Sequence, residues 1–537
     1  MDTAWSLESW LTAEQVGRWM PTLKLAFWLL FVLFILLALV YGLRGESRKT
    51  IGKSYRILCS LLVLWFAGIL AYQATWQLAG FARPEFVKFQ RHYNRRPDHP
   101  AARIVRGSIL DHRGVPLAVS DPASPGKRVY PEGPAFCHLL GYDHPVYGVA
   151  GMEAVEQETL SGIPREAGPE WERIRRHLTN RDELRGTNIA LTVSAALQRE
   201  VHALMQGRKG AVVALDPTRG DILVLYSAPG YDPNRMAPGQ FERGEPEARM
   251  LNRALQGLYP AGSTFKVLVA AAALERGLDP SLDCPSAGYQ ARTGSQPIRD
   301  HEYYEYQRRG QAWPGYGILD LRSALAKSSN VYFARLGVMI GGESLRALAV
   351  RSGLTQSWIL HEGSSGNLAS APGRIPMLSN RDQARTAQIS IGQGELLVTP
   401  IYLALLAGSI GHDGVLVPPR LSRLSPSRDP LTVMSPDTAR RLAGMMRHTV
   451  TSGTGRAADL AGLSVAGKTG TAQNPHGADH GWFIGFAPVN RPRVAFAVIV
   501  EQGGYGAQSA LPVAVGLLRK AQALGGFDEP GPKPEGN

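Results

Sequence analysis

The sequence predicts an α+β protein in which one antiparallel sheet carries helices on both faces. Two observations predict this: β-like apolar runs occur at both ends of the second half of the chain, and the long segment between them is rich in helical patterns. Strands at the two ends of a domain, with helices between them, favour a single sheet covered by helices. The strand candidates lie at residues 210–215, 222–226, 463–470, 482–487 and 494–500.

Two apolar stretches within residues 1–82 predict a membrane anchor with two transmembrane helices, at about 23–43 and 57–80. Residues 25–43 and 57–82 contain no charged side chain, and each stretch is long enough to cross a bilayer. A cleaved signal peptide is the alternative for the first stretch, but no Ala-x-Ala-like site follows a short apolar core. The connecting loop carries five positive charges and one negative charge, which predicts a cytoplasmic loop and an extracytoplasmic chain after residue 83. Its charged residues are Arg44, Glu46, Arg48, Lys49, Lys53 and Arg56.

The rest of the chain divides into three parts. Residues 83–205 combine short β-like runs with polar turns and contain no catalytic constellation, so we expect a separate supporting domain. The catalytic domain is expected at residues 206–525, with an apolar helix at about 510–524 closing it. Residues 526–537 are rich in Pro, Gly and charge, which predicts a disordered tail.

Composition excludes some classes of function. The 537 residues suffice for two or three domains. The net charge of +13 is spread along the chain, without a Lys/Arg-rich stretch interleaved with aromatic residues, so we expect no nucleic-acid binding. A basic surface facing anionic lipid or cell-wall polymer explains the charge as well. The three cysteines form no disulfide framework; Cys59 lies in an apolar stretch, which leaves Cys137 and Cys284 as the one pair that could form.

The candidate nucleophile is Ser263, in the string Ser263-Thr264-Phe265-Lys266. It opens the apolar run at residues 267–274, which predicts a buried helix with the Ser263 hydroxyl at its N-terminus. Ser124-Pro125-Gly126-Lys127 has the same spacing, but Pro and Gly forbid the helix that would bring its Ser and Lys onto one face. Lys266 could accept the hydroxyl proton if its amine were neutral, which burial and a second nearby cation both favour.

Two further strings supply polar groups for the same chemistry. Ser328-Ser329-Asn330 offers a hydroxyl that can relay a proton to a leaving amine, and an amide that can hold substrate backbone or Lys266. Lys468-Thr469-Gly470-Thr471 offers a cation and hydroxyls for a terminal carboxylate, and Gly470 allows substrate backbone to approach closely. Lys468 could also be the second cation beside Lys266. Taken singly, each string has an ordinary alternative, because Ser-Ser-Asn is a common cap and Lys-Thr-Gly a common turn.

The three strings in this order resemble those of class B penicillin-binding proteins, the monofunctional D,D-transpeptidases that cross-link peptidoglycan. The resemblance covers about residues 83–525. It implies a penicillin-binding transpeptidase domain of the serine β-lactamase-like fold, standing on an elongated β-rich pedestal or dimerisation domain at residues 83–205. Further matching strings are Gly210 to Asp216, Tyr231-Asp232-Pro233-Asn234, Ile391-Gly392-Gln393-Gly394, Trp482-Phe483-Ile484-Gly485 and, in the pedestal, Arg106-Gly107 and Gly151-Met152-Glu153.

The resemblance also implies a role for each site residue, inhibition by β-lactams, and a SEDS-family membrane glycosyltransferase as partner at the cell membrane. Three departures from the family pattern are His112, Tyr316 and a second membrane helix; neither residue is expected to touch the chemistry. The implied roles are acylated nucleophile for Ser263, base for Lys266, second motif for Ser328 and Asn330, carboxylate anchors for Lys468 and Thr469, close approach at Gly470, and an oxyanion amide for Thr471.

Two alternatives use the same fold. A D,D-carboxypeptidase or β-lactamase-like hydrolase would differ only in letting water reach the acyl-enzyme, and a noncatalytic scaffold or sensor would lose turnover. No plainly placed Glu serves as a deacylating base, and Ser263, Lys266 and Lys468 are all present. No metal or cofactor is expected, because the His476 and His480 pair lies in a loop rather than on a helix.

Overall fold

The computed structural model describes residues 104–162, 184–241, 247–425, 428–475 and 477–526, together with isolated positions between 52 and 69. The chain divides into two compact units, Met1–Asn94 and Arg95–Asn537. Among the described positions, no helix is long and apolar enough to cross a membrane. The predicted span at 23–43, most of the span at 57–80 and the tail after Gly526 lie outside the described residues, so these expectations stay predictions.

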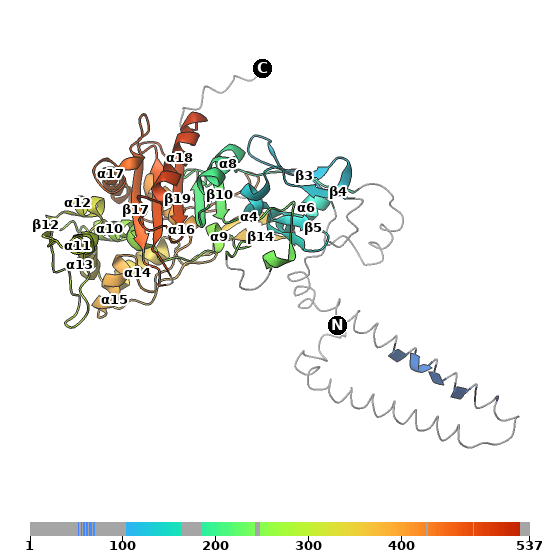
Figure 1. Ribbon diagram of the computed structural model, residues 1–537, viewed down its shortest axis with the longest axis horizontal. Helices are drawn as coiled ribbons and strands as arrows, with labels where there is room; N and C mark the ends of the chain where they lie inside the picture. Colours follow the sequence, from blue (N-terminus) through green and yellow to red (C-terminus); the bar gives the residue numbers. More distant parts are fainter. Residues whose placement is uncertain are drawn as a thin grey trace, which may run out of the picture. The chain divides into compact units, whose positions relative to one another are not determined.

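A five-stranded antiparallel sheet lies at the centre of the second unit, in the order β10-β9-β19-β18-β17 (Figure 1). All five predicted strand runs belong to it, and the third begins at Ala466 rather than at residue 463. Strand β17 lies at one edge, and its outer side pairs with no strand in the described part of the chain. The strands are β9 (Gly210–Leu215), β10 (Ile222–Ala228), β17 (Ala466–Ala472), β18 (His480–Ala487) and β19 (Val494–Val500).

Helices cover both faces of this sheet, as predicted. Alternate residues of a strand point to opposite faces. Val213 and Leu215 of β9 belong to the apolar core shared with α10 (Lys266–Glu275) and α16 (Pro400–Gly411). Val212 and Ala214 belong instead to a second core, shared with α8 (Ala195–Leu204) and α18 (Ala510–Ala523).

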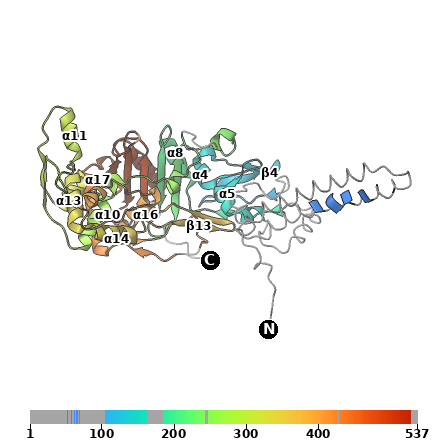
Figure 2. The same cartoon turned by 90° about the horizontal axis from the view of Figure 1, so that it is seen from below.

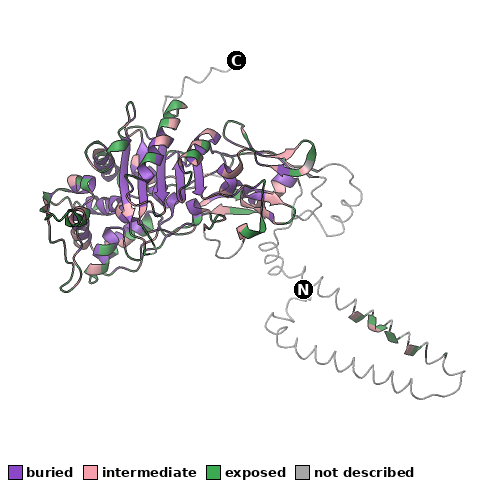
Figure 3. Ribbon diagram, viewed as in Figure 1, coloured by how far each residue is buried: buried purple, intermediate pink, exposed green. Residues whose placement is uncertain are grey.

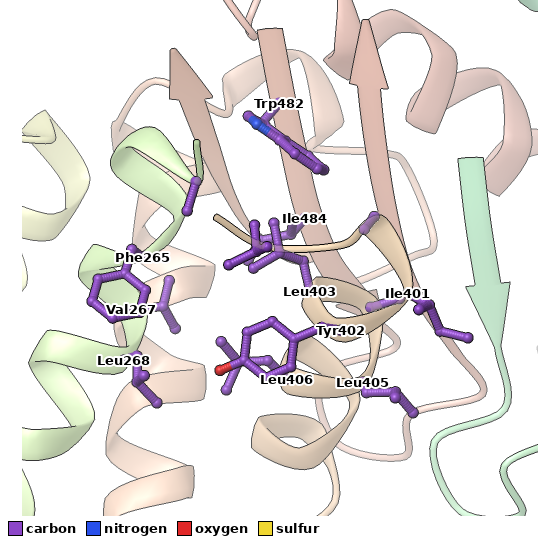
Figure 4. Close-up of a cluster of buried hydrophobic side chains, with 14 of the residues drawn as sticks. Phe265, Val267, Leu268, Ile401, Tyr402, Leu403, Leu405, Leu406, Trp482 and Ile484 are labelled. Atoms are coloured by element: carbon purple, nitrogen blue, oxygen red, sulfur yellow. The ribbon is translucent and has the colours of Figure 1, made fainter. Parts of the chain in front are cut away.

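Helix α16 is the central helix of the larger core. It is apolar on all sides because neighbouring elements enclose it on all sides (Figure 3). Thr399 caps its N-terminus by accepting a hydrogen bond from the Tyr402 amide at 3.3 Å, and Pro400 suits the first helical position. Figure 4 shows α16 side chains between the start of α10 and strand β18. This packing fixes the helix that follows Ser263 relative to the sheet.

The remaining elements of the catalytic domain are mostly short. The helices are α9 (Arg253–Gln256), α11 (His301–Arg308), α12 (Leu321–Lys327), α13 (Asn330–Ile340), α14 (Gly342–Arg351), α15 (Gln383–Ser390) and α17 (Pro436–Ser452). The 3-10 turns are η4 (Pro238–Phe241), η5 (Gly262–Thr264) and η6 (Arg456–Ala458). The strand pairs are β11 (Leu282–Pro285) with β12 (Gly315–Leu319), β13 (Ile359–Gly363) with β14 (Gly366–Ala369), and β15 (Val415–Leu416) with β16 (Leu431–Thr432).

The pedestal is built around a buried ion cluster. Glu153 is wholly buried and accepts hydrogen bonds from Arg106 Nη2 at 2.8 Å and Arg128 Nε at 2.6 Å. Burial alone would raise the pKa of Glu153, but the two guanidinium groups hold it below its ordinary value. The Ser124–Lys127 string lies in a strand of this domain, so its Ser and Lys share no helix face.

The pedestal strands form a four-stranded sheet in the order β4-β3-β2-β8 and two strand pairs, β1 with β7 and β5 with β6. Its elements are β1 (Ile104–Val105), β2 (Ile109–Leu110), β3 (Pro116–Asp121), β4 (Ser124–Val129), η3 (Gly133–Phe136), α4 (Cys137–Leu140), β5 (Tyr142–His144), β6 (Gly148–Ala150), α5 (Gly151–Val155), α6 (Gln157–Ser161), β7 (Leu184–Arg185) and β8 (Ile189–Ala190).

The two cysteines that could have paired do not. Cys137 and Cys284 are both free and buried, in α4 and β11. The one disulfide that the sequence left open is therefore absent.

The β13–β14 hairpin joins the catalytic domain to the pedestal, and Figure 2 shows β13 extending toward α4 and α5. Glu156, between α5 and α6, contacts the buried ring of His361 on β13, with Oε1 and Nε2 2.5 Å apart. At the hairpin turn, the Ser365 amide donates to the Val155 carbonyl at 2.8 Å. At its other end, the Ala371 amide donates to the Leu255 carbonyl at 2.8 Å, on the short helix before the Ser263 loop.

Candidate active site

Ser263 lies in the 3-10 turn η5, directly before α10, so its hydroxyl stands at the helix N-terminus as predicted. The turn packs closely against Gly392 on one side and Thr471 on the other. A Cβ on Gly392 would lie 1.8 Å from the Gly262 carbonyl oxygen, and a Cβ on Gly262 would lie 2.4 Å from that of Thr471. Gly262 and Gly392 also have positive φ angles, 53° and 77°, which glycine adopts without strain. These glycines allow the nucleophile turn to sit against β17.

Lys266 is wholly buried, and its amine is held by the second string. Its Nζ donates to the Ser328 carbonyl and to Asn330 Oδ1, both at 2.6 Å, and lies 3.4 Å from Ser328 Oγ. Asn330 presents its oxygen to Lys266 because its Nδ2 donates to the Arg299 carbonyl at 3.0 Å. Of the two uses foreseen for the Asn330 amide, the structure shows the contact with Lys266.

Burial lowers the pKa of Lys266 to about 7, so a large fraction of the amine is neutral near neutral pH. A neutral amine has two N–H groups and one lone pair. Because the Ser328 carbonyl and the Asn330 amide oxygen are acceptors only, they take both N–H groups and leave the lone pair to receive a hydroxyl proton; the Ser328 hydroxyl, 3.4 Å away, can also donate to it. A free lone pair on Lys266 is what a base for the Ser263 hydroxyl requires.

The second string lies where two helices meet. Ser328 ends α12 with a φ of 61°, which an ordinary residue adopts only at some cost, and Ser329 caps α13 by accepting from the Tyr332 amide at 3.1 Å. The bend directs the Ser328 hydroxyl to Lys468, whose Nζ lies 2.8 Å from Ser328 Oγ. Ser328 therefore contacts both lysine amines.

Lys468 lies on β17 and is wholly buried; its Nζ also donates to the Thr469 carbonyl at 2.9 Å. Burial, and then the nearby Lys266 charge, hold the pKa of Lys468 well below its ordinary value. The sequence predicted that burial and a second nearby cation, for which Lys468 was the candidate, would together favour a neutral Lys266. In the structure burial does so, and the repulsion between the amines acts on Lys468.

The rest of the third string follows along the edge strand. Gly470 leaves no room for a side chain, since a Cβ would lie 2.8 Å from the Thr264 methyl carbon. The Thr469 hydroxyl is hydrogen-bonded to the Thr454 hydroxyl. The Thr471 backbone packs against Gly262 in the Ser263 turn. The structure thus brings together all the predicted site residues: Ser263, Lys266, Ser328, Asn330, Lys468, Thr469, Gly470 and Thr471.

Asp300 is a site residue that the sequence did not reveal. Its Oδ1 accepts from Ser329 Oγ at 2.9 Å and from the Val331 amide at 3.1 Å, so it holds the second string in place. Its Oδ2 is buried and has no hydrogen-bond partner in the described part of the chain. Burial raises the pKa of Asp300, and its negative charge in turn raises that of Lys266. A long segment that includes α11 separates Asp300 from the second string, so the spacing of residues in the sequence did not point to Asp300.

Among the described residues, no group of three or more His, Cys, Asp or Glu side chains could hold a metal ion. His476 lies outside the described residues. Within the described part, the Ser263 hydroxyl makes no hydrogen bond, which leaves its oxygen available to a substrate.

A serine and a lysine at the start of one buried helix, a Ser-x-Asn string between two helices and a Lys-Thr-Gly edge strand together define the serine acyltransferases that react with penicillin. The family model of the penicillin binding protein transpeptidase domain matches residues 210–519. The model of the penicillin binding protein A dimerisation domain matches residues 106–189. The chain belongs to the penicillin-binding proteins, as a class B member.

Similar proteins support this assignment. The peptidoglycan D,D-transpeptidase PbpA of Mycolicibacterium smegmatis is 33% identical over 418 residues, which cover 70% of this chain and 79% of that protein. The peptidoglycan D,D-transpeptidase MrdA of Acinetobacter baumannii is 30% identical over 446 residues, covering 72% of this chain and 65% of that protein. The solved structure of penicillin-binding protein A from M. tuberculosis, as a ceftriaxone acyl-enzyme, matches with a TM-score of 0.66 and 28% identity over 78% of this chain and 99% of that one.

Proposed function

We propose that this protein is a peptidoglycan D,D-transpeptidase that works through an acyl-enzyme on Ser263 and is inhibited by β-lactams. The observation that carries the proposal is the environment of Lys266, which begins the helix directly after the Ser263 turn and whose buried amine has a pKa of about 7 with both N–H groups of its neutral form held by acceptors. The similar proteins named as peptidoglycan D,D-transpeptidases, and the ceftriaxone acyl-enzyme of a relative, support the same chemistry.

In the first half-reaction, Ser263 Oγ attacks the carbonyl between the two terminal D-alanines of a stem peptide, and its proton passes to Lys266 Nζ. The Ser263 amide at the helix N-terminus and the Thr471 amide on β17 stabilise the oxyanion, because both lie on the turn and strand that meet at Gly262. The C–N bond breaks, and Ser328 relays the proton from Lys266 to the departing D-alanine amine. No cofactor is required.

The third string binds the terminal carboxylate of the substrate. Burial and the nearby Lys266 charge lower the pKa of Lys468, and an arriving carboxylate would raise it again. The free edge of β17 can pair with the extended peptide backbone, and Thr469 lies on this strand. In the second half-reaction, an amine of a neighbouring peptide attacks the acyl carbonyl, forms the cross-link and releases Ser263.

The hydrolase alternative differs in the fate of the acyl-enzyme. Deacylation by water needs a base beside the ester, and in the described part of the chain no carboxylate hydrogen-bonds to Ser263, Lys266 or Ser328. Asp300 accepts hydrogen bonds from Ser329 and Val331 and, in the described part of the chain, makes none with Lys266. This arrangement favours slow hydrolysis and transfer to an amine.

The proposal is tested by incubating the purified protein with fluorescent penicillin and following label attachment and release. We expect a long-lived adduct on the parent and none on Ser263→Ala. Ser124→Ala is a matched control, since Ser124 has the same spacing to a lysine but lies in strand β4, and it should label like the parent. A parent that stays unlabelled would refute an acyl-enzyme mechanism, and release within seconds would favour the hydrolase.

We further propose that residues 1–82 anchor the protein in the cell membrane through two helices, with the pedestal at 83–205 and the catalytic domain at 206–525 outside. The uncharged stretches and the positively charged loop between them support this topology. A SEDS-family glycosyltransferase would then supply the glycan strands beside the anchor. Protease added to intact spheroplasts should cleave the pedestal and leave a tag at the loop around Lys49 intact; cleavage at the loop would reverse the topology.

A further inference from the structure

The loop that follows α17 packs on the end of α12, just before the second string, and contacts the third string. Its residues Gly453 to Gly455 turn the chain after the helix, and the Gly453 and Gly455 amides both donate to the Thr449 carbonyl, at 3.0 and 3.1 Å. A Cβ on Gly453 would lie 2.4 Å from the Ala326 carbonyl oxygen, so the loop backbone packs directly on the end of α12. The loop is therefore held by backbone contacts, independently of the Thr454 side chain.

Thr454 connects this loop to the end of α12 and to the third string. Its amide donates to the Ala326 carbonyl at 3.3 Å, two residues before Ser328. Its hydroxyl oxygen lies 2.5 Å from the Thr469 hydroxyl oxygen, on the carboxylate-binding strand. Thr469 is 6% exposed, whereas Thr454 is exposed, so the hydroxyl pair reaches from the buried strand to the surface.

The direction of this hydrogen bond decides what Thr469 can do. A threonine hydroxyl has one proton to donate, and a substrate carboxylate can only accept. If Thr469 donated to Thr454, its proton would be unavailable to the substrate. If Thr454 donates to Thr469, the Thr469 proton is free to point at the carboxylate, and the incoming hydrogen bond polarises Thr469 as a donor.

We propose that Thr454 is a positioning residue for carboxylate recognition: it donates to Thr469 Oγ1 and thereby holds the Thr469 proton toward the terminal carboxylate of the substrate. This inference rests on the proposed function, because it needs a carboxylate-bearing acyl donor at the third string. Thr454 acts through Thr469 and touches no reacting atom.

The test compares Thr454→Val, which removes only the hydroxyl and keeps the branched shape, with Thr454→Ser, which keeps a hydroxyl. The readout is the second-order rate of acylation by a fluorescent penicillin and by its methyl ester, which lacks the carboxylate charge. We expect Thr454→Val to slow acylation by the free acid roughly five- to tenfold through weaker initial binding, in line with one lost hydrogen bond between neutral hydroxyls. With the methyl ester, Thr454→Val should react as fast as the parent does with the same ester. Thr454→Ser should react at near-parental rates.

A double-mutant cycle with Thr469→Val separates the pathways. If Thr454 acts through Thr469, Thr454→Val should cost nothing more in the Thr469→Val background. Equal losses with free acid and ester would show that Thr454 only supports the loop and would overturn the inference. A loss that persists in Thr469→Val would also overturn it, by placing Thr454 in direct contact with the carboxylate. A parent that neither probe acylates would refute the proposed function, and the inference about Thr454 would be refuted with it.

Discussion

At the scale of single residues, the chemistry depends on the charge of Lys266. Two opposing effects set its pKa: burial lowers it, and the negative charges of Asp300 and Glu302 raise it. The result, a pKa of about 7, leaves a large neutral fraction under physiological conditions. Asp300 can act on Lys266 through its charge because both groups are buried, where charges are weakly screened.

The pH dependence of acylation should report this pKa. The neutral amine is the base, so the acylation rate should fall about tenfold per pH unit well below about pH 7 and level off above it. Asp300→Asn removes a charge that favours the protonated amine, so the midpoint should move to lower pH. Asparagine can still accept from the Val331 amide and Ser329, which preserves the second string. Rates of penicillin labelling across this range provide the measurement, and an unmoved midpoint in the variant would contradict the role given to Asp300.

At the scale of elements, the position of the nucleophile turn depends on the turn at Gly392. The Gly262 amide donates to the Gly392 carbonyl at 2.9 Å, and the two backbones are too close for any side chain. The string Ile391 to Gly394, one of those that resemble the family, therefore supports the Ser263 turn through the backbone of Gly392.

A matched pair of glycines tests this support. Gly392 and Gly394 have nearly equal positive φ angles, 77° and 76°, but a Cβ on Gly394 would meet nothing closer than 3.7 Å. Backbone strain should cost both alanine variants about 1–2 kcal/mol of stability, and Gly392→Ala should lose more because its Cβ would overlap the Gly262 carbonyl. Only Gly392→Ala must displace the Ser263 turn, so it alone should slow acylation, roughly ten- to a hundredfold. Urea unfolding and penicillin labelling measure the two effects, and equal labelling rates in both variants would refute the support.

At the scale of the whole molecule, the β13–β14 hairpin links the pedestal to the segment before Ser263. The Glu156 carboxylate accepts from Thr159 Oγ1 at 2.7 Å and from the Ser364 amide at 3.3 Å, besides its contact with His361. Burial alone would raise the pKa of Glu156, but these partners lower it to about 2. The link between domains is therefore strongest when Glu156 is ionised.

Stability should follow the charge of Glu156. A carboxylate whose pKa falls from 4.5 to about 2 on folding adds stability above about pH 4.5 and loses it as the pH falls toward 2. Glu156→Gln should thus be less stable than the parent at neutral pH, and the difference should narrow below about pH 4.5. Glu158→Gln is the control, because its carboxylate makes no hydrogen bond in the described part of the chain. Urea midpoints across pH give the result, and a gap independent of pH would rule out the ionised link.

Much of the fold and site could be predicted because the signals are local. The five strands are short apolar runs bounded by turn residues, and the nucleophile string precedes an uninterrupted apolar helix. Asp300 and Thr454 could not be found this way. Each contacts a residue that is distant in the sequence and becomes its neighbour only in the folded chain: Asp300 contacts Val331, and Thr454 contacts Thr469.

The sequence by itself determined the class of the protein, the nucleophile, the three strings and the five strands, because motif spacing and apolar periodicity are properties of the chain. The tertiary structure decided which group keeps Lys266 neutral, which partner Asn330 holds, that Cys137 and Cys284 stay apart, and how the hairpin reaches the pedestal. These depend on burial and on contacts between distant segments, which exist only once the two cores have packed against the sheet.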